Sequence, residues 1–154
     1  MNIVEKLYAL LIRAASSLQS PFLLAIRLYW GWQFHQTGRG KLGNISKVIE
    51  FFTNLGIPAP ALNAWFVSGL EFAGGLLLMV GLASRPIALL FVIDMIVAFL
   101  AADREALGSI FSDPDKFYAA APYTFLFASL IVLIFGPGKF SLDAWIGSRR
   151  SHKK

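Results

Sequence analysis

Long apolar stretches separated by short polar ones dominate the hydrophobic pattern of this chain. A membrane-spanning helix needs about 20 mainly apolar residues, with a range of about 17 to 25. Four stretches approach that length: residues 22–38, 63–82, 86–102 and 119–136. In hydrocarbon every backbone polar group must be paired, and stretches of this length achieve that as helices rather than as strands. The pattern therefore predicts an all-α fold, an integral membrane four-helix bundle.

Amphipathic stretches lie on both sides of the first predicted span. Within residues 2–18, apolar side chains recur at helical spacing and polar ones take the other side, which predicts an N-terminal amphipathic interfacial helix. Ser20 and Pro21 would separate it from the span. A cleaved signal peptide is the alternative, but its apolar centre would be short and interrupted by Arg13. A second short amphipathic helix is predicted at 45–55, on the opposite face of the membrane.

The composition fits a membrane better than water as the surrounding solvent. Of 154 residues, 56% are hydrophobic and 15% are charged, whereas soluble domains average about 25% charged residues. The mean hydropathy is +0.63, and the length suits a single domain, residues 1–154. The absence of cysteine excludes disulfides, thiolate metal sites and dithiol redox chemistry by the chain's own side chains. No cluster of His and carboxylate residues has metal-ligand spacing, so no metal site is expected.

Lys and Arg residues are distributed unevenly between the two ends of the predicted bundle. Eight lie in the N-terminal segment, the second turn and the C-terminal region, and five lie in the first and third loops. The positive-inside rule therefore predicts a multi-pass protein with both termini in the cytoplasm. The basic tail at 144–154 is explained by anionic lipid headgroups. No nucleic-acid-binding motif accompanies it, so no nucleic-acid partner is expected.

The first two predicted spans each carry a charged residue on a face that also holds glycines. Arg27 shares its face with residues that follow at spacings of four and three: Gly31, Phe34, Gly38 and Lys41. Glu71 shares its face with Gly74 and Gly75. Small residues let neighbouring membrane helices approach closely. Both charged residues are therefore expected to point into the bundle.

Arg27, Glu71 and Asp94 are the ionisable side chains near the middle of the predicted spans, and each costs about 2.5–3.5 kcal/mol there. We expect Arg27 to be the counter-ion of Glu71, because its long side chain can reach toward the membrane centre. With Asp94 the cluster would hold one positive and two negative charges. We therefore hypothesise that one of the two carboxyl groups is protonated at neutral pH. The alternative is a buried polar contact that only fixes helix register.

His35 lies at the outer end of the first span, close to Trp30 and Trp32 in the sequence. It could relay protons or contact a quinone-like head group. The favoured interpretation is an interfacial histidine within a belt of aromatic side chains, which gather at this depth because their rings are amphipathic.

Four motifs follow one another along residues 22–143. They are the first-helix pattern Arg27, Gly31, Phe34, Gly38, Lys41 and Leu42; the turn LGIP at 55–58; the second-helix pattern from Glu71 through Gly74, Gly75 and Gly81 to Arg85; and GPGKFSLD at 136–143. Their order and content resemble the DoxX family of small bacterial membrane proteins. The resemblance implies a four-helix bundle in the inner membrane, related in architecture to quinone-using membrane oxidoreductases.

This resemblance leads to a functional hypothesis: an accessory subunit, non-catalytic or co-catalytic, that holds a membrane-associated oxidoreductase near the quinone pool. Arg27, Glu71 and Lys41 would position a quinone oxygen or a proton, with Asp94 assisting. The alternatives are a small proton-coupled transporter or channel, and a structural membrane scaffold. A non-covalent quinone is the expected cofactor, and lipid is an expected partner. The glycine faces fit either packing within one chain or a homo-oligomer interface.

Overall fold

The computed structural model describes residues 2–151, and every regular element in that range is a helix. In chain order the helices are α1 (Ile3–Gly43), α2 (Ile45–Asn54), α3 (Pro60–Val80), α4 (Ser84–Ala101), α5 (Arg104–Gly108), α6 (Pro114–Ala119), α7 (Ala121–Phe135) and α8 (Leu142–Ser151). The all-α prediction is confirmed for the described residues. The predicted helix at 45–55 is α2, and the last three predicted spans correspond to α3, α4 and α7. Residues 152–154 of the predicted basic tail lie outside the described range.

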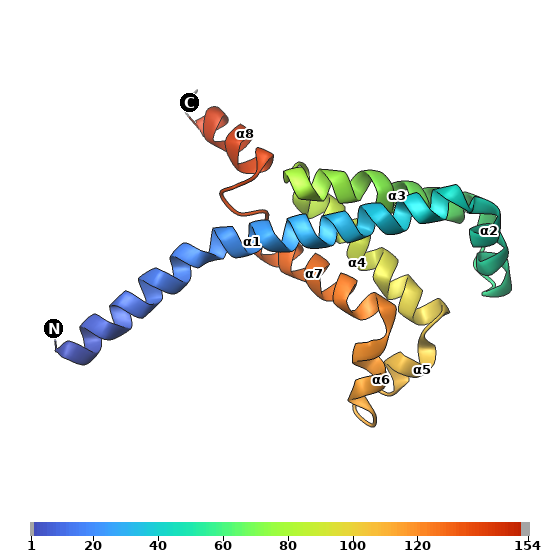
Figure 1. Ribbon diagram of the computed structural model, residues 1–154, viewed down its shortest axis with the longest axis horizontal. Coiled ribbons are helices and arrows are strands. Elements are labelled where there is room, and N and C mark those ends of the chain that lie inside the picture. The colour runs from blue at the N-terminus through green and yellow to red at the C-terminus, as the bar shows by residue number, and fades with distance from the viewer. Residues whose placement is uncertain (1, 152–154) are drawn as a thin grey trace.

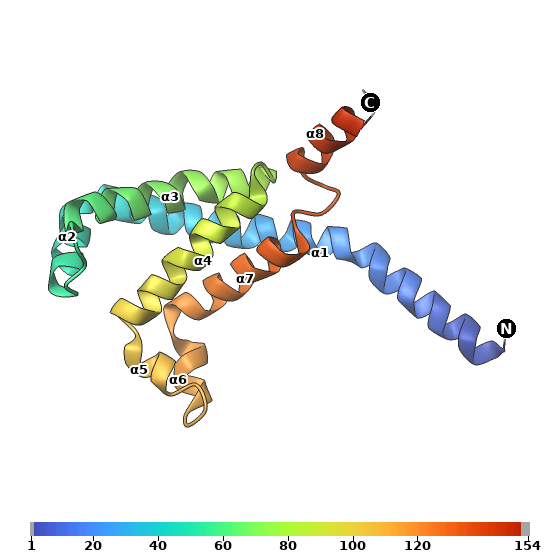
Figure 2. The same cartoon turned by 180° about the vertical axis from the view of Figure 1, so that it is seen from behind.

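α1 joins two segments that the sequence predicts as separate helices. It begins with a capping box: the Asn2 side chain accepts a hydrogen bond from the Glu5 N–H at 3.0 Å, and the Glu5 carboxylate accepts one from the Asn2 N–H at 3.1 Å. The predicted break at Pro21 is wrong, because Pro21 lies inside a helix that continues to Gly43. A proline removes one intrahelical hydrogen bond and bends a helix. α1 does change direction in its N-terminal half (Figure 1; Figure 2).

The N-terminal part of α1, residues 3–18, projects from the body of the molecule as an arm (Figure 1). All of its side chains are exposed except the half-buried Ala9. A helix of 41 residues is about 60 Å long at 1.5 Å per residue, about twice the 30 Å hydrocarbon core of a bilayer. α1 as a whole is therefore longer than one membrane crossing requires.

A tight turn connects α3 to α4. Gly81 adopts a φ of 72°, and its N–H donates to the Leu77 carbonyl at 3.0 Å, which ends α3. The short connection between the predicted spans 63–82 and 86–102 is confirmed. After the turn α4 diverges from α3 and packs along α7 (Figure 2). The two helices are therefore neighbours at the turn but not along their whole lengths.

Phe34 of α1 lies at the centre of the core and is fully buried. Its ring stacks on Phe91 of α4 with centroids 3.7 Å apart and meets Phe125 of α7 edge-on at 4.7 Å. α1 and α3 pack side by side through their glycines: a Cβ atom on Gly31 would lie 2.8 Å from the carbonyl oxygen of Gly75. The expectation that the glycine faces allow close helix approach is confirmed. The buried face of α1 follows the predicted spacing, from Arg27 to residue 38.

Three helices, α1, α3 and α4, are long and apolar enough to cross a membrane among the described residues. The fourth predicted span corresponds to α7. This helix has 15 residues and is shorter than the roughly 17 residues that a membrane crossing needs. The segment between α4 and α7 contains the two short helices α5 and α6, which the sequence pattern did not predict. Phe117 of α6 stacks on Phe99 of α4 at 5.2 Å, which anchors this segment to the bundle.

Candidate functional site

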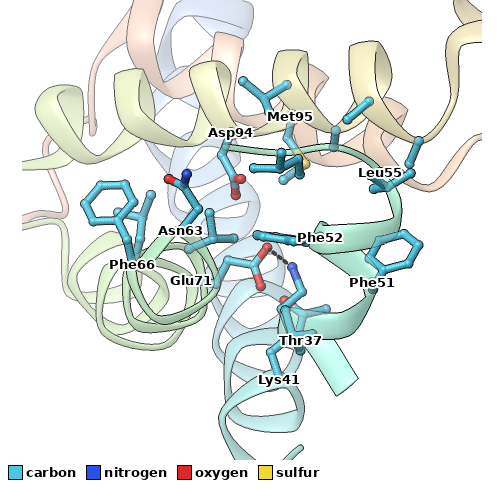
Figure 3. A pocket seen from close by; sticks show the side chains of 18 of the residues that line it. Thr37, Lys41, Phe51, Phe52, Leu55, Asn63, Phe66, Glu71, Asp94 and Met95 are labelled. Atoms are coloured by element: carbon cyan, nitrogen blue, oxygen red, sulfur yellow. Dashed lines mark hydrogen bonds and ion pairs between the residues drawn. The ribbon is translucent and has the colours of Figure 1, made fainter. Parts of the chain in front are cut away.

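A cavity of about 930 Å³ lies between the C-terminal part of α1, α2, α3 and α4. α4 leaves α3 after their shared turn, and α2 packs against α3 beside the resulting space. The lining is mainly apolar and includes Phe51 and Phe52 from α2 and Phe66 from α3 (Figure 3). Ligand pockets in proteins typically measure about 300–1,000 Å³ and combine apolar walls with a few polar groups. The cavity has the size and character of such a pocket.

Lys41 and Glu71 form an ion pair at this cavity, with Nζ 2.7 Å from Oε1. The Glu71 side chain is only 3% exposed, whereas that of Lys41 is 33% exposed. Local sequence explains the meeting: Lys41 continues the buried face of α1, and Gly38 one turn earlier lies directly against the α3 backbone at Glu71 and Phe72. A side chain at position 38 would separate the helices. The glycine therefore brings the ammonium within reach of the carboxylate.

Asp94 of α4 is the third charged group of this site. Its carboxyl group points toward Glu71 from across the cavity (Figure 3). Asp94 Oδ2 and Glu71 Oε2 are both buried, and neither has a hydrogen-bond partner. Ala98 and Ala101 also line the cavity, because residues four and seven positions after Asp94 share its face of the helix. We refer to Lys41, Glu71 and Asp94 as the polar cluster.

The polar cluster combines one cation with two carboxyl groups in the lining of a mainly apolar cavity. Charged groups with few water contacts interact more strongly than in bulk water, and an unpaired buried charge is costly. The arrangement can hold a proton between the carboxyl groups, or present a donor and acceptors to a polar ring of a bound molecule. Within residues 2–151, no three His, Cys, Asp or Glu side chains gather as metal ligands would.

The expected ion pair between Arg27 and Glu71 is wrong. Gly38, which contacts Glu71, lies 11 residues after Arg27 in α1, about 16 Å along the axis. Arg27 is fully buried elsewhere: its Nη2 donates to the carbonyl oxygen of Phe140, and its guanidinium lies against Gly81. Arg27 does face inward, as predicted, but it joins α1 to the α3–α4 turn and the segment at 136–143. The cation of the polar cluster is Lys41 instead.

Asp143 interacts with the charge of Arg27 and stabilises the start of α4. Its carboxylate accepts hydrogen bonds from the backbone N–H groups of Ala83 and Ser84, each at 2.8 Å, at the start of α4. Burial opposes ionisation of Asp143, but the Ser84 and Ala83 N–H groups and the charge of Arg27 outweigh it and lower the pKa of the carboxyl. Asp143 therefore acts as a cap for α4. Sequence reasoning missed this role, although the motif at 136–143 contained the residue.

His35 lies on the face of α1 that meets α3, and it is not among the residues that line the cavity. Its Nδ1 atom lies 3.0 Å from the carbonyl oxygen of Phe72, and the two rings pack with centroids 4.5 Å apart. A carbonyl oxygen can only accept, so Nδ1 carries the proton and donates it. The His35 side chain thus ties α1 to α3 rather than joining the polar cluster.

The aromatic wall of the cavity was also missed as part of a site. Phe51 and Phe52 belong to the amphipathic helix predicted at 45–55, which was expected only to lie on the membrane face. Its apolar side instead contributes to the cavity. The amphipathic pattern was the available signal, but it does not identify what the apolar side covers.

Comparisons with known proteins agree with this arrangement of motifs. The sequence model of the DoxX family matches residues 22–104, which span α1 from its first buried turns through α4 and include the whole polar cluster. The chain is also 27% identical over 123 residues to a Bacillus subtilis (strain 168) protein named "Putative oxidoreductase CatD", covering 80% of this chain and 85% of that protein. No solved structure gives a significant match. Since the family match extends over more than half of its length, the chain belongs to the DoxX family.

Proposed function

We propose that this chain is an accessory, quinone-binding subunit of a membrane oxidoreductase system. The observation that carries the proposal is the polar cluster of Lys41, Glu71 and Asp94 at a mainly apolar cavity of about 930 Å³. A mainly apolar space with one cluster of charged groups suits a molecule that has an apolar tail and an oxygen-bearing ring. The cavity volume is large enough for such a ring and the first part of its tail.

The residues of the site fit the polar end of a quinone. Lys41 is one-third exposed, and only one of its three N–H donors is used on Glu71, so it can donate to a ring oxygen. Glu71 Oε2 and Asp94 Oδ2 are buried acceptors without partners, so they can receive a ring hydroxyl. A bound quinone would supply two-electron, two-proton redox chemistry. The chain's own residues would orient the ring and hold protons beside it.

We further propose that Glu71 and Asp94 share one proton at neutral pH. Two carboxylates facing each other with only one ammonium nearby would repel each other, and the membrane interior offers little water to screen them. A shared proton removes the excess negative charge. The hypothesis of one protonated carboxyl group is the same as the one drawn from the sequence. The cation beside the two acids is now Lys41 instead of Arg27.

The oxidoreductase connection draws on the relative as well as on the site. That relative carries the name of an oxidoreductase, and the absence of cysteine excludes thiol redox chemistry by this chain's own side chains. A partner enzyme would therefore perform the electron transfer, and this chain would hold the quinone for it.

The proposed topology has four crossings of the bacterial inner membrane, by α3, α4, α7 and the part of α1 after Pro21. The arm at residues 3–18 would then lie along the membrane interface, since α1 is too long to remain within one crossing. Both described ends of the chain lie on the same side of the molecule (Figure 1). With the larger number of Lys and Arg residues on that side, the positive-inside rule favours cytoplasmic termini.

The facing carboxyl groups also favour a second candidate function, a proton-coupled transporter, because intramembrane acids often mark ion paths. Purified protein in sealed vesicles with a pH-sensitive dye separates the two functions. A proton flux that Glu71→Gln abolishes would favour transport. The absence of flux, together with bound quinone, would favour the oxidoreductase subunit.

The direct test of quinone binding is to purify the full chain in mild detergent and identify its extracted small molecules by mass spectrometry. We expect a quinone close to one equivalent in the wild type and in Glu105→Gln, a control on the exposed surface of α5. We expect much less in Glu71→Gln. No quinone in the wild type, or equal amounts in all three proteins, would contradict the proposal.

A further inference from the structure

The cavity lies in the half of the bundle that is remote from the described chain ends. Its lining comes from α1 from Thr37 onward, α3 as far as Glu71 and α4 from Leu90 onward, together with α2 and the loop that follows it. α2 lies at one end of the molecule, and the arm and α8 lie at the other (Figure 1; Figure 2). We call these two ends the α2 face and the terminal face. The polar cluster belongs to the half of the bundle next to the α2 face.

The rim of the cavity at the junction of α1 and α2 is polar and exposed. Asn44 connects the two helices, Lys47 lies in the first turn of α2, and both are exposed residues of the lining. Lys41 lies in the last turn of α1, and its side chain is partly exposed although it pairs with the nearly buried Glu71. A spanning helix ends where it leaves the hydrocarbon, so exposure at this point is exposure to water and headgroups. Through Lys41 the polar cluster is in contact with the α2 face.

Toward the terminal face, the polar cluster is closed off by the apolar core. Phe91 lies one turn before Asp94 in α4, and Phe34 lies two turns before Lys41 in α1. Both rings are fully buried and stack on each other with centroids 3.7 Å apart. The same core contains the buried residues Leu78, Ala88 and Val132. Close packing of this kind leaves no room for a chain of water molecules in that direction.

From this arrangement we infer that the polar cluster exchanges protons with water at the α2 face only. The charged side chains along the path are Lys47, Lys41, Glu71 and Asp94, one from each helix that lines the cavity. The consequence for a ligand rests on the proposed function. Reduction of a bound quinone by a partner enzyme takes up two protons with the two electrons, and these protons would be drawn from the α2 face. The chain would thereby couple electron transfer to proton uptake from one defined side of the membrane.

Thiol labelling tests the sidedness directly, because the chain contains no cysteine and each introduced one is unique. Glu50→Cys on α2 marks the α2 face and Ser148→Cys on α8 marks the terminal face, since both side chains are exposed. Asp94→Cys reports on the polar cluster. Each variant of the full chain is treated with a cationic methanethiosulfonate that does not cross membranes, in right-side-out and in inverted membrane vesicles.

We expect Asp94→Cys to react in the vesicles that label Glu50→Cys and to be protected in those that label Ser148→Cys. Ala98→Cys, one turn farther along the cavity wall, leaves the polar cluster intact and carries the test if Asp94→Cys does not fold. Ala88→Cys in the buried core should stay unlabelled in both kinds of vesicle. Labelling of the cavity cysteines from the terminal face, or from neither face, would overturn the inference.

A charge reversal at the rim tests the path itself. When Lys47→Glu is combined with Asp94→Cys, the ratio of the labelling rates with a cationic and an anionic methanethiosulfonate should rise, because a charge acts over about 8 Å at physiological salt. Arg39→Glu is the matched control, since Arg39 is exposed near the end of α1 but does not line the cavity. This control should change the ratio less. Equal changes would overturn the assignment of the path to the junction of α1 and α2.

A quinone competitor separates this inference from the proposed function. Excess decylubiquinone should slow the labelling of Ala98→Cys, because a ligand in the cavity would cover this wall. Labelling from the α2 face that the quinone does not slow would support the inference and contradict quinone binding. Protection by the quinone, together with labelling from the terminal face, would support quinone binding and overturn the inference.

Discussion

The Nζ atom of Lys41 lies 2.7 Å from Oε1 of Glu71, and this ion pair joins the last turn of α1 to the buried face of α3. The carbonyl groups at the C-terminus of a helix favour a nearby cation, so the position suits a lysine. The carboxylate, in contrast, is almost completely buried. Each charge therefore stabilises the other. The nearly buried Glu71 carboxylate needs its counter-ion more than the partly exposed Lys41 ammonium does.

Removing the lysine alone should be more harmful than removing both partners. Lys41→Met leaves Glu71 as an uncompensated buried acid and should reduce stability by about 1–3 kcal/mol. The double variant Lys41→Met with Glu71→Gln should recover most of the loss. Thermal unfolding in detergent, followed by circular dichroism, measures both. Lys116→Met serves as the control, since its ion pair with Glu105 is exposed and should contribute little. Purely additive losses in the double variant would contradict the coupling.

Two glycines of α1 should respond in opposite directions to the same substitution. A Cβ atom on Gly38 would collide with the backbone of Phe72, so Gly38→Ala should destabilise the protein by about 1–3 kcal/mol through strained packing. A Cβ atom on Gly40 would meet no other atom within 4 Å. Gly40→Ala should therefore stabilise the helix by about 0.4–1 kcal/mol. Thermal unfolding compares the two, and equal effects would contradict the close α1–α3 contact.

Asp143 should make stability depend on pH in the acidic range. The pKa of Asp143 is lowered from its ordinary value of 3.8 because, against the cost of burial, the N–H groups of Ser84 and Ala83 favour the charged form. A lowered folded-state pKa means that the stabilisation is fully present above 3.8 and is lost as the pH falls through the lower folded value. Asp143→Asn should thus reduce the unfolding temperature at neutral pH, with the difference shrinking in acid.

The control for that measurement is Asp113→Asn, since Asp113 precedes α6 and its side chain makes no cap hydrogen bond. This variant should follow the wild type across the pH range. A constant difference between wild type and Asp143→Asn at all pH values would show that the carboxylate charge is not what stabilises the start of α4.

The facing carboxyl groups of Glu71 and Asp94 should give a protonated-acid band in the carbonyl region of the infrared spectrum at neutral pH. Either Glu71→Gln or Asp94→Asn removes the second acid, so the remaining one should ionise beside Lys41 and the band should disappear. Glu105→Gln should keep the band. A wild-type spectrum without the band, and without change in Asp94→Asn, would contradict the shared proton.

Helix geometry explains why much of the fold was predictable from the sequence. Arg27, Gly31, Phe34 and Gly38 fall on one face of any α-helix, so their common burial follows from spacing alone. The break predicted at Pro21 failed for a different reason. A single proline costs one hydrogen bond, and the helix formers on both sides continue the helix through it.

The partner of Glu71 could not be predicted from spacing. It depends on how far α1 is shifted along α3, and that shift is set by three-dimensional packing: Gly31 lies against Gly75, and Gly38 lies against Glu71. In this register Arg27 reaches Gly81 and only Lys41 reaches the acid. The cavity could not be predicted from the sequence either, because it arises where α4 diverges from α3 rather than from any local pattern.

Photolabelling with an azido-quinone tests most directly whether the cavity of the polar cluster binds a quinone. The full chain is irradiated in mild detergent, and labelled peptides are identified by mass spectrometry with and without excess decylubiquinone. We predict label on cavity-lining segments, such as those around Phe52 and Phe66, that excess ligand suppresses and Glu71→Gln reduces. Label confined to the exposed arm at residues 3–18, or label that excess ligand does not suppress, would contradict the account.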